Sequence, residues 1–324
     1  MRSRYSRWSL VALLVIAGCG LNGGAAALAA DLPEVASLRD RLAHPKPGDV
    51  ITIAHRACWK ETAENSLAGV RRCIEMGVDG VEFDVRHTKD GVPVVIHDET
   101  VDRTTDGHGA VSALTFDQVR RLHLRAGAGG PGAPLTAERV PTLSEYLLAA
   151  KGRLLLVFDV KDWTQAETFA AARVAGVSRQ AIFFYECRNH DLLEKIKGFW
   201  DDALVFPIAF ESDGPLSQSM DKCRSNPTGM IHTKWVHDSF LEAATGAIKA
   251  RNERVWIATM FPDDVAGHYD KDALVDPESV WGRQLQAGAN MIMTNEPRAL
   301  LAFLRRRPAA GTGEVGTLGN RRGR

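Results

Sequence analysis

The chain has 324 residues with 40 basic and 40 acidic side chains, and 45% of its residues are hydrophobic. This composition is that of an ordinary globular protein and excludes a disordered chain or a coiled coil. Because its Lys and Arg residues form no basic stripe, we expect no nucleic-acid partner and look for a small-molecule site.

Residues 1–30 are predicted to be an export signal. Three arginines precede an apolar run from Leu10 to Ala17, which is too short to cross a bilayer. Two processing sites fit this segment. Cys19 ends a sequence that resembles a lipobox and would carry a lipid anchor, whereas residues 27–29 suit ordinary signal cleavage. We therefore expect an exported protein that is periplasmic, lipid-anchored or secreted, with that anchor as its one membrane contact.

Four cysteines lie beyond this segment: Cys58, Cys73, Cys187 and Cys223. In an oxidising compartment they can form disulfides. No two of them form a C-x-x-C pair, and four cysteines allow three complete pairings, so the pairing stays open. Buried free thiols are the alternative in a domain large enough to fold without disulfides.

Eight short apolar runs rich in β-branched and aromatic residues are predicted to be strands. They are residues 50–54, 80–86, 153–160, 181–185, 204–210, 229–232, 255–259 and 291–294. Helical spacing between them predicts helices at 66–76, 143–150, 164–175, 190–199, 239–251 and 279–287. Eight strand–helix units predict a (β/α)₈ TIM barrel. The alternative, an open doubly wound sheet, lacks a G-x-G-x-x-G motif after the first strand.

A long insertion, residues 87–142, separates the second and third predicted strands. It holds a short predicted helix at 115–122 and a glycine-rich stretch at 126–133. An insertion of this length is typical of an active-site rim. The barrel is predicted to span residues 31–307, and the tail at 308–324 is predicted to be disordered because it has few apolar residues.

Acidic residues lie where a barrel carries its chemistry, at the C-terminal ends of strands. Glu82 and Asp84 are two residues apart on one strand, so both carboxylates point into the lumen. Unpaired carboxylates there would repel each other, and a divalent cation removes that cost. Asp159 supplies a third oxygen ligand, and such ligands favour Mg²⁺ or Ca²⁺ over Zn²⁺. The alternative is a structural ion pair of these acids with Arg86 or Lys161.

A series of linked motifs resembles the glycerophosphodiester phosphodiesterase family. In chain order they are His55-Arg56, Glu64-Asn65, residues 82–91, His97-Asp98, residues 102–109, residues 140–143 and Asp159-Val160-Lys161, with weaker matches at 255–259 and 290–297. The resemblance implies a (β/α)₈ barrel that hydrolyses glycerophosphodiesters to glycerol 3-phosphate and an alcohol, with one divalent cation.

The resemblance also implies roles for individual residues. The cation ligands would be Glu82, Asp84 and Asp159. His55 and His97 would be the general acid and base, in an order that the sequence leaves open. Arg56 and Lys161 would bind the phosphate.

Three positions depart from the family pattern: Ala57 replaces the usual Gly, Asp159 the commoner Glu, and Asn295 the usual Asp. These departures bear on the identity of the substrate more than on the class of reaction. Trp59 follows Ala57 closely and is predicted to form one wall of the substrate pocket.

Other polar residues have more ordinary interpretations. Asn65 is predicted to cap the following helix, and Glu64 to shape the loop before it. His232 and Lys234 follow the sixth strand and are further candidates for substrate contact.

Two other functions remain open from sequence. One is a catalytically weak barrel that binds sugar-phosphate or lipid head groups, and the other is a phospholipase-like relative. The complete set of predicted catalytic residues favours the enzyme over the binding protein. An enzyme acting on intact lipids would need an apolar entrance, for which the sequence gives no signal.

Overall fold

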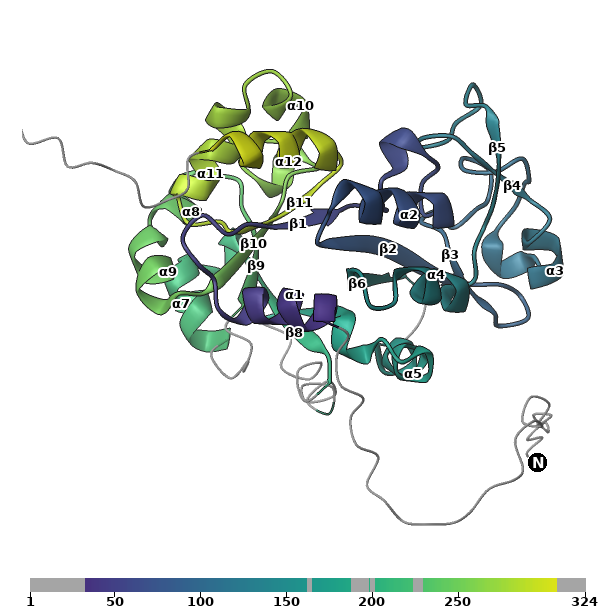
Figure 1. Cartoon of the computed structure of the whole chain (residues 1–324), viewed down its shortest axis with the longest axis horizontal. Coiled ribbons are helices and arrows are strands. Elements are labelled where there is room, and N and C mark those ends of the chain that lie inside the picture. The colour runs from purple at the N-terminus through teal and green to yellow at the C-terminus, as the bar shows by residue number, and fades with distance from the viewer. Residues whose placement is uncertain (1–32, 162–164, 188–197, 199–201, 224–229, 308–324) are drawn as a thin grey trace, which may run out of the picture. The chain divides into compact units, whose positions relative to one another are not determined.

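The computed structural model of the chain describes residues 33–161, 165–187, 198, 202–223 and 230–307 (Figure 1). The predicted signal at 1–30, the predicted helix at 190–199 and the predicted tail at 308–324 lie outside the described residues, apart from position 198.

Eight parallel strands in the described ranges close into a barrel. They are β1 (Ile51–Ala54), β2 (Gly80–His87), β6 (Leu155–Val160), β7 (Ala181–Glu186), β8 (Leu204–Phe210), β9 (Met230–Lys234), β10 (Arg254–Ala258) and β11 (Met291–Thr294). They pair in the order β1-β11-β10-β9-β8-β7-β6-β2, and β2 pairs again with β1 to close the barrel. The predicted barrel is confirmed, and each strand lies within two residues of its predicted position.

Apolar side chains fill the barrel lumen, among them Ile53, Val157 and Trp256. A helix that the sequence did not predict, α1 (Pro33–Ala43), adds two leucines to this cluster. The helix lies at the N-terminal end of the barrel. There the Arg254 guanidinium, at the start of β10, donates a hydrogen bond to the carbonyl of Arg41 in α1. Arg254 is fully buried there, and its charge is paired with Asp49 at 3.1 Å.

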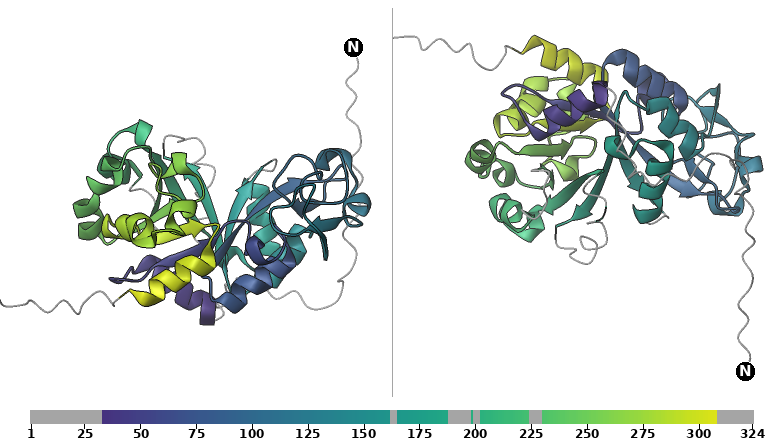
Figure 2. Two further views of the ribbon diagram at one scale, coloured as in Figure 1. Left: turned by 90° about the horizontal axis from the view of Figure 1, so that it is seen from above. Right: turned by 60° about the horizontal axis from the view of Figure 1, so that its bottom comes forward.

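Helices surround the barrel, as Figure 2 shows. They are α2 (Leu67–Met76), α4 (Leu143–Ala150), α5 (Gln165–Ala175), α7 (Leu216–Lys222), α8 (Ser239–Glu242), α9 (Thr245–Arg251), α10 (Asp270–Ala273), α11 (Arg283–Gln286) and α12 (Pro297–Arg306). The predicted helix 239–251 is divided into α8 and α9, and a π-helical turn (Glu278–Gly282) precedes α11. The described helices include none with the length and apolar character that a membrane crossing requires.

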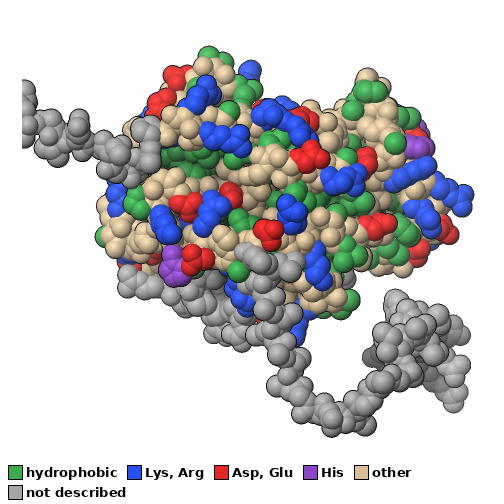
Figure 3. All heavy atoms as spheres, viewed as in Figure 1, with side chains coloured by type: hydrophobic (Ala, Val, Ile, Leu, Met, Phe, Trp, Pro, Cys, Tyr) green, Lys and Arg blue, Asp and Glu red, His purple; other side chains and the backbone are tan. Residues whose placement is uncertain are grey.

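The insertion at 87–142 is a folded unit with a small core of its own. It contains β3 (Pro93–Val95), which pairs antiparallel with the end of β2, the antiparallel pair β4 (His123–Arg125) and β5 (Leu135–Arg139), and α3 (Phe116–Val119). Apolar residues such as Val101 and Leu124 form its core. In Figure 1 the unit lies beside α2 and α4, on the side away from α8 to α12. On the face seen in Figure 3, basic and acidic side chains are interspersed.

Two disulfides join the four cysteines: Cys58 with Cys73, and Cys187 with Cys223. The interpretation of these residues as free thiols is therefore wrong in this structure. The first bond ties the connection after β1 to α2, and its Cα atoms are 5.5 Å apart, within the usual range for a disulfide. It begins three residues after His55, so it restrains a loop that carries predicted site residues.

Candidate active site

The three predicted acidic ligands converge at the C-terminal ends of β2 and β6. Strand register places Asp84 directly beside Asp159. One carboxylate oxygen from each of Glu82, Asp84 and Asp159 lies within 4.8 Å of the others. Glu82 and Asp84 are 3% and 1% exposed, so water solvates them poorly. The predicted convergence of these acids in the barrel is confirmed.

The electrostatics of this cluster fit a divalent cation. Burial raises the pKa of Glu82 well above its usual value, and the charges of Asp84 and Asp159 raise it further. The Oδ1 atom of Asp84 is buried, and the Lys161 ammonium lies 3.2 Å from it. Three hard oxygen donors close together form a set that Mg²⁺ or Ca²⁺ can use.

Lys161 follows β6 and lies between two of the acids. Its Nζ atom is 2.6 Å from Oδ2 of Asp159 and 3.2 Å from Oδ1 of Asp84. Burial lowers the pKa of Lys161, but the two carboxylates outweigh that effect and the net pKa is raised. The ammonium group is therefore charged in the centre of the site. Its contact with phosphate stays a prediction.

His55 follows β1 and is held by an amide. Its Nδ1 atom is 2.8 Å from Oδ1 of Asn295, which also accepts a hydrogen bond from the Trp59 indole at 3.2 Å. Because an indole N–H can only donate, the atom facing both rings is the amide oxygen, and Nδ1 of His55 carries the proton. Its Nε2 atom is available for proton transfer and lies 3.8 Å from Oε2 of Glu82. Burial lowers the pKa of His55 to about 4, so the ring is neutral near pH 7.

The connection after β1 is held in an unusual backbone conformation. Arg56 and Ala57 have φ angles of +53° and +62°, in the left-handed region that favours glycine. The Arg56 backbone N–H donates to Glu82 at 2.9 Å, and its guanidinium lies 3.2 Å from Glu64. The methyl group of Ala57 faces Gly69 of α2, where any Cβ atom would lie only 3.1 Å from it.

Asn65 does not cap α2, so that prediction is wrong. Ser66 is the capping residue, and its hydroxyl accepts a hydrogen bond from the backbone N–H of Gly69. Asn65 has a φ angle of +58°, and its buried side chain donates to Oδ2 of Asp84 at 2.7 Å. The sequence could not separate these roles, because Asn and Ser are both good capping residues. Asn65 therefore orients a predicted metal ligand.

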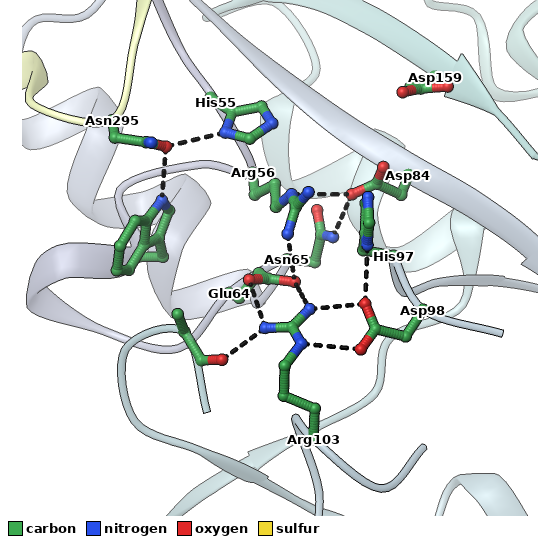
Figure 4. A network of polar contacts seen from close by, with 12 residues as sticks. His55, Arg56, Glu64, Asn65, Asp84, His97, Asp98, Arg103, Asp159 and Asn295 are labelled. Atoms are coloured by element: carbon green, nitrogen blue, oxygen red, sulfur yellow. Dashed lines mark hydrogen bonds and ion pairs between the residues drawn. The ribbon is translucent and has the colours of Figure 1, made fainter. Parts of the chain in front are cut away.

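His97 comes from the insertion. The backbone N–H of Ile96 bonds the carbonyl of Asp84, which places the next residue, His97, beside the acids. Nδ1 of His97 is 2.7 Å from Oδ1 of Asp98. Hydrogen bonds from Arg103 hold the pKa of Asp98 below its usual range, so its side chain is an ionised carboxylate. Nδ1 of His97 therefore donates a hydrogen bond to it, and Nε2 of His97 is available for proton transfer. Figure 4 shows the contacts of His97 and Arg103 with Asp98.

The remaining candidates lie around this centre. Trp59 is half-buried and bonded to Asn295, which is consistent with a pocket wall. Sequence reasoning missed Phe261, which is 49% exposed and has its ring centre 6.1 Å from that of His55. His232 is buried, packs on Trp256 and bonds the carbonyl of that residue through Nδ1, so its burial argues against the predicted substrate contact. Lys234 pairs with Asp264.

Comparison with known sequences identifies relatives over part of the chain. The profile of the glycerophosphoryl diester phosphodiesterase family matches residues 55–299. Glycerophosphodiester phosphodiesterase 1 of Mus musculus is 46% identical over 118 residues, which are 36% of this chain and 35% of the mouse protein. A glycerophosphodiester phosphodiesterase of Caldanaerobacter subterraneus is 48% identical over 95 residues, 29% of this chain and 38% of the relative. These alignments span little more than a third of each relative.

Solved structures share the fold over most of the chain. A glycerophosphoryl diester phosphodiesterase from Parabacteroides distasonis has a TM-score of 0.70 at 19% identity, covering 87% of this chain and 95% of its own. An Oleispira antarctica phosphodiesterase in complex with the product sn-glycerol-3-phosphate has a TM-score of 0.57 at 22% identity, covering 79% and 97%. Since the family profile extends from His55 nearly to the end of the barrel, the chain belongs to the glycerophosphoryl diester phosphodiesterase family.

Proposed function

We propose that the protein is an exported, metal-dependent hydrolase that cleaves glycerophosphodiesters to glycerol 3-phosphate and an alcohol. The observation that carries this proposal is the group of three acids whose carboxylate oxygens lie within 4.8 Å of one another. Two histidines flank these acids, and the Nδ1 atom of each is hydrogen-bonded to a neighbouring side chain. Family membership and the product bound to the Oleispira protein support it.

Glu82, Asp84 and Asp159 would hold one divalent cation, Mg²⁺ or Ca²⁺. Such a cation, when bound, neutralises negative charge that builds on phosphoryl oxygens. Arg56 and Lys161 are charged groups beside the same acids and would bind the phosphate oxygens. Their present carboxylate partners hold them in place for that role.

His55 and His97 would share the proton transfers. One imidazole removes the proton of the attacking oxygen, and the other protonates the departing alkoxide. Attack by water gives glycerol 3-phosphate directly. Attack by the neighbouring glycerol hydroxyl gives a cyclic phosphodiester, which water then opens to glycerol 3-phosphate. In each ring the second nitrogen bonds Asn295 or Asp98, which fixes the direction of Nε2. Trp59 would line the pocket on the side of Asn295.

Export is supported by the signal-like residues 1–30 and by the two disulfides, which are typical of oxidising compartments. The lipobox-like sequence at Cys19 favours a periplasmic or lipid-anchored protein, and cleavage at 27–29 a secreted or soluble periplasmic one. Mass spectrometry of the N-terminus in cell-envelope and culture fractions distinguishes these forms, and an intact N-terminus in the cytoplasm contradicts export.

A substrate panel tests the activity. Protein lacking residues 1–30 is incubated with glycerophosphocholine, glycerophosphoethanolamine, glycerophosphoglycerol, glycerophosphoinositol and an aryl phosphodiester, each with Mg²⁺, Ca²⁺ or a chelator. We expect release of glycerol 3-phosphate that stops with the chelator and returns when the cation is restored. Hydrolysis of the aryl diester alone, or activity that survives chelation, contradicts the proposal.

A further inference from the structure

Arg103 of the insertion has every guanidinium N–H bonded. Its Nε and Nη2 atoms donate to the two oxygens of Asp98 at 2.7 and 2.8 Å. Its Nη2 and Nη1 atoms donate to the two oxygens of Glu64 at 2.7 and 3.0 Å. The last N–H of Nη1 donates to the carbonyl of Ala128. Two bidentate carboxylate contacts fix a planar guanidinium in both position and orientation.

Each carboxylate leads on to a residue of the site (Figure 4). Asp98 accepts from Nδ1 of His97, and Glu64 lies 3.2 Å from Arg56. Glu64 is 3% exposed and comes from the connection after β1, whereas Asp98 comes from the insertion. Arg103 therefore links the two segments that carry His55 and His97.

The glycine-rich stretch at 126–133 closes over this arginine. Gly130 donates its backbone N–H to the carbonyl of Arg103 at 2.7 Å. Gly129 has a φ angle of +73°, and a Cβ atom there would lie 2.3 Å from the same carbonyl oxygen. The backbone of Gly127 bonds that of Thr62 and Glu64. The close approach at Gly129 requires a residue without a side chain. The backbone bonds of the stretch hold the backbones of Arg103 and Glu64 together.

We propose that Arg103 is a positioning residue for turnover. It fixes the carboxylate of Asp98, which in turn holds the His97 ring with Nδ1 protonated and Nε2 free. It also holds the insertion against the connection that follows β1. The inference rests on the proposed function, in which His97 transfers a proton. Lysine cannot replace this role, because a single ammonium group lacks the planar fork that binds two carboxylates at once.

A kinetic comparison tests the inference, with the substrate that the wild type cleaves fastest. We expect R103K to lower kcat about 10- to 100-fold, as is typical when the partner of a reactive group is lost, and to leave KM within about threefold. Arg125 of the same insertion donates to the main-chain carbonyls of Thr105 and Ala133, so R125K is the matched control and keeps kcat. Equal losses in R103K and R125K, or an unchanged kcat in R103K, overturn the proposal.

The double variant shows whether Arg103 acts through Asp98. If it does, D98A/R103K has the same kcat as D98A alone, since both changes interrupt one route to His97. Fully additive losses overturn this route. Circular dichroism and thermal unfolding identify a variant that fails to fold. In that case D98A, which removes the acceptor of Nδ1 at a half-exposed position, carries the test by itself through the spectrum described next.

A spectroscopic readout makes the test independent of activity. In protein with ¹⁵N-labelled histidine, the resonances of His97 are assigned by their loss in His97→Gln. We expect the wild type to show a protonated Nδ1, and both R103K and D98A, which removes the acceptor, to show mixed tautomers. An unchanged His97 spectrum in these variants overturns the positioning role. A wild type that cleaves no glycerophosphodiester overturns the proposed function instead, so the two failures are distinguishable.

Discussion

The rings of the two proposed catalytic histidines are held in different ways. His55 stands at the end of β1, and its partner Asn295 follows β11, where strand register pairs Ala54 with Thr294. The partners are thus brought together by the barrel itself. The ring of His97 is held by Asp98, whose carboxylate pairs with Arg103 of the insertion. Arg103 in turn pairs with Glu64 of the connection after β1.

Burial explains why the two partners differ in charge. The His55 side chain is 11% exposed, and the His97 side chain is 32% exposed. A charged partner costs more in the drier place, where a neutral amide orients the ring without bringing a further charge into the low dielectric. The half-exposed insertion can keep a carboxylate ionised when an arginine pairs with it. An insertion can therefore supply a reactive group to a barrel if ion pairs, in place of strand register, fix the position of that group.

The strongest test of this comparison removes each histidine. We expect His55→Ala and His97→Ala each to lower kcat about 10²- to 10⁴-fold, the usual contribution of a general acid or base. Rates with a glycerophosphodiester and the favoured cation measure the loss, and circular dichroism checks the fold. If one variant keeps the wild-type rate, the region that carries that histidine is not catalytic.

The next test concerns the disulfide that restrains the connection after β1. Replacing Cys58 and Cys73 with serine is expected to lower the free energy of unfolding by about 3 kcal/mol, as the loss of a cross-link across 15 residues predicts. Urea unfolding measures this loss. The matched control replaces Cys187 and Cys223, and we expect it to lower stability to a similar extent but to leave kcat unchanged. A loss of kcat in the control alone would contradict the inference that the Cys58–Cys73 bond is the one that restrains the site residues after β1.

A smaller effect is expected from the amide that orients His55. Asn295→Leu removes the acceptor from Nδ1 and should lower kcat about 10- to 100-fold, in line with other ring-orienting partners. Trp59→Phe removes only the other hydrogen bond to the same oxygen, which is worth at most about a tenfold change. A larger loss in the Trp59 variant would show that the indole, rather than the amide, controls the site.

The last prediction concerns how the stability of the barrel and of the insertion depends on pH. Burial lowers the pKa of His232 in the lumen to about 3, so between pH 6.5 and 3 the unfolded chain binds a proton that the native chain does not. Stability should therefore fall by up to about 1.4 kcal/mol for each pH unit of acidification that this group controls. Asp98 has a lowered pKa, so its contribution persists until the pH falls below the ordinary aspartate range.

Urea unfolding between pH 7 and pH 4 measures this dependence. His232→Phe should flatten the slope, because phenylalanine fills a similar volume and does not titrate. His44→Gln at an exposed position after α1 is the control and should leave the slope unchanged. An equal slope in His232→Phe and the wild type would mean that the imidazole is accommodated in its charged form.

The strands and the acids could be predicted from sequence, because both depend on local patterns. Apolar runs such as β6 mark buried strands, and Glu82 and Asp84 share a face by simple alternation. The partners of the histidines could not be predicted. Asn295 meets His55 across 240 positions of sequence, and Arg103 meets Glu64 across 39, through folding that no local pattern reveals. Helix α1 was missed because it lies outside the repeated strand–helix units.

The contact between Ala57 and Gly69 has a consequence for how the family varies. A methyl group at one position crowds a methyl group at the other, since their carbons would be 3.1 Å apart and one of them would have to shift. Relatives with glycine at the loop position are thus free to place alanine in the helix, where it is favoured by roughly 1 kcal/mol. We expect the two sites to have exchanged residues during evolution. The alanine two residues after His55 thus competes with α2 for one small volume between loop and helix.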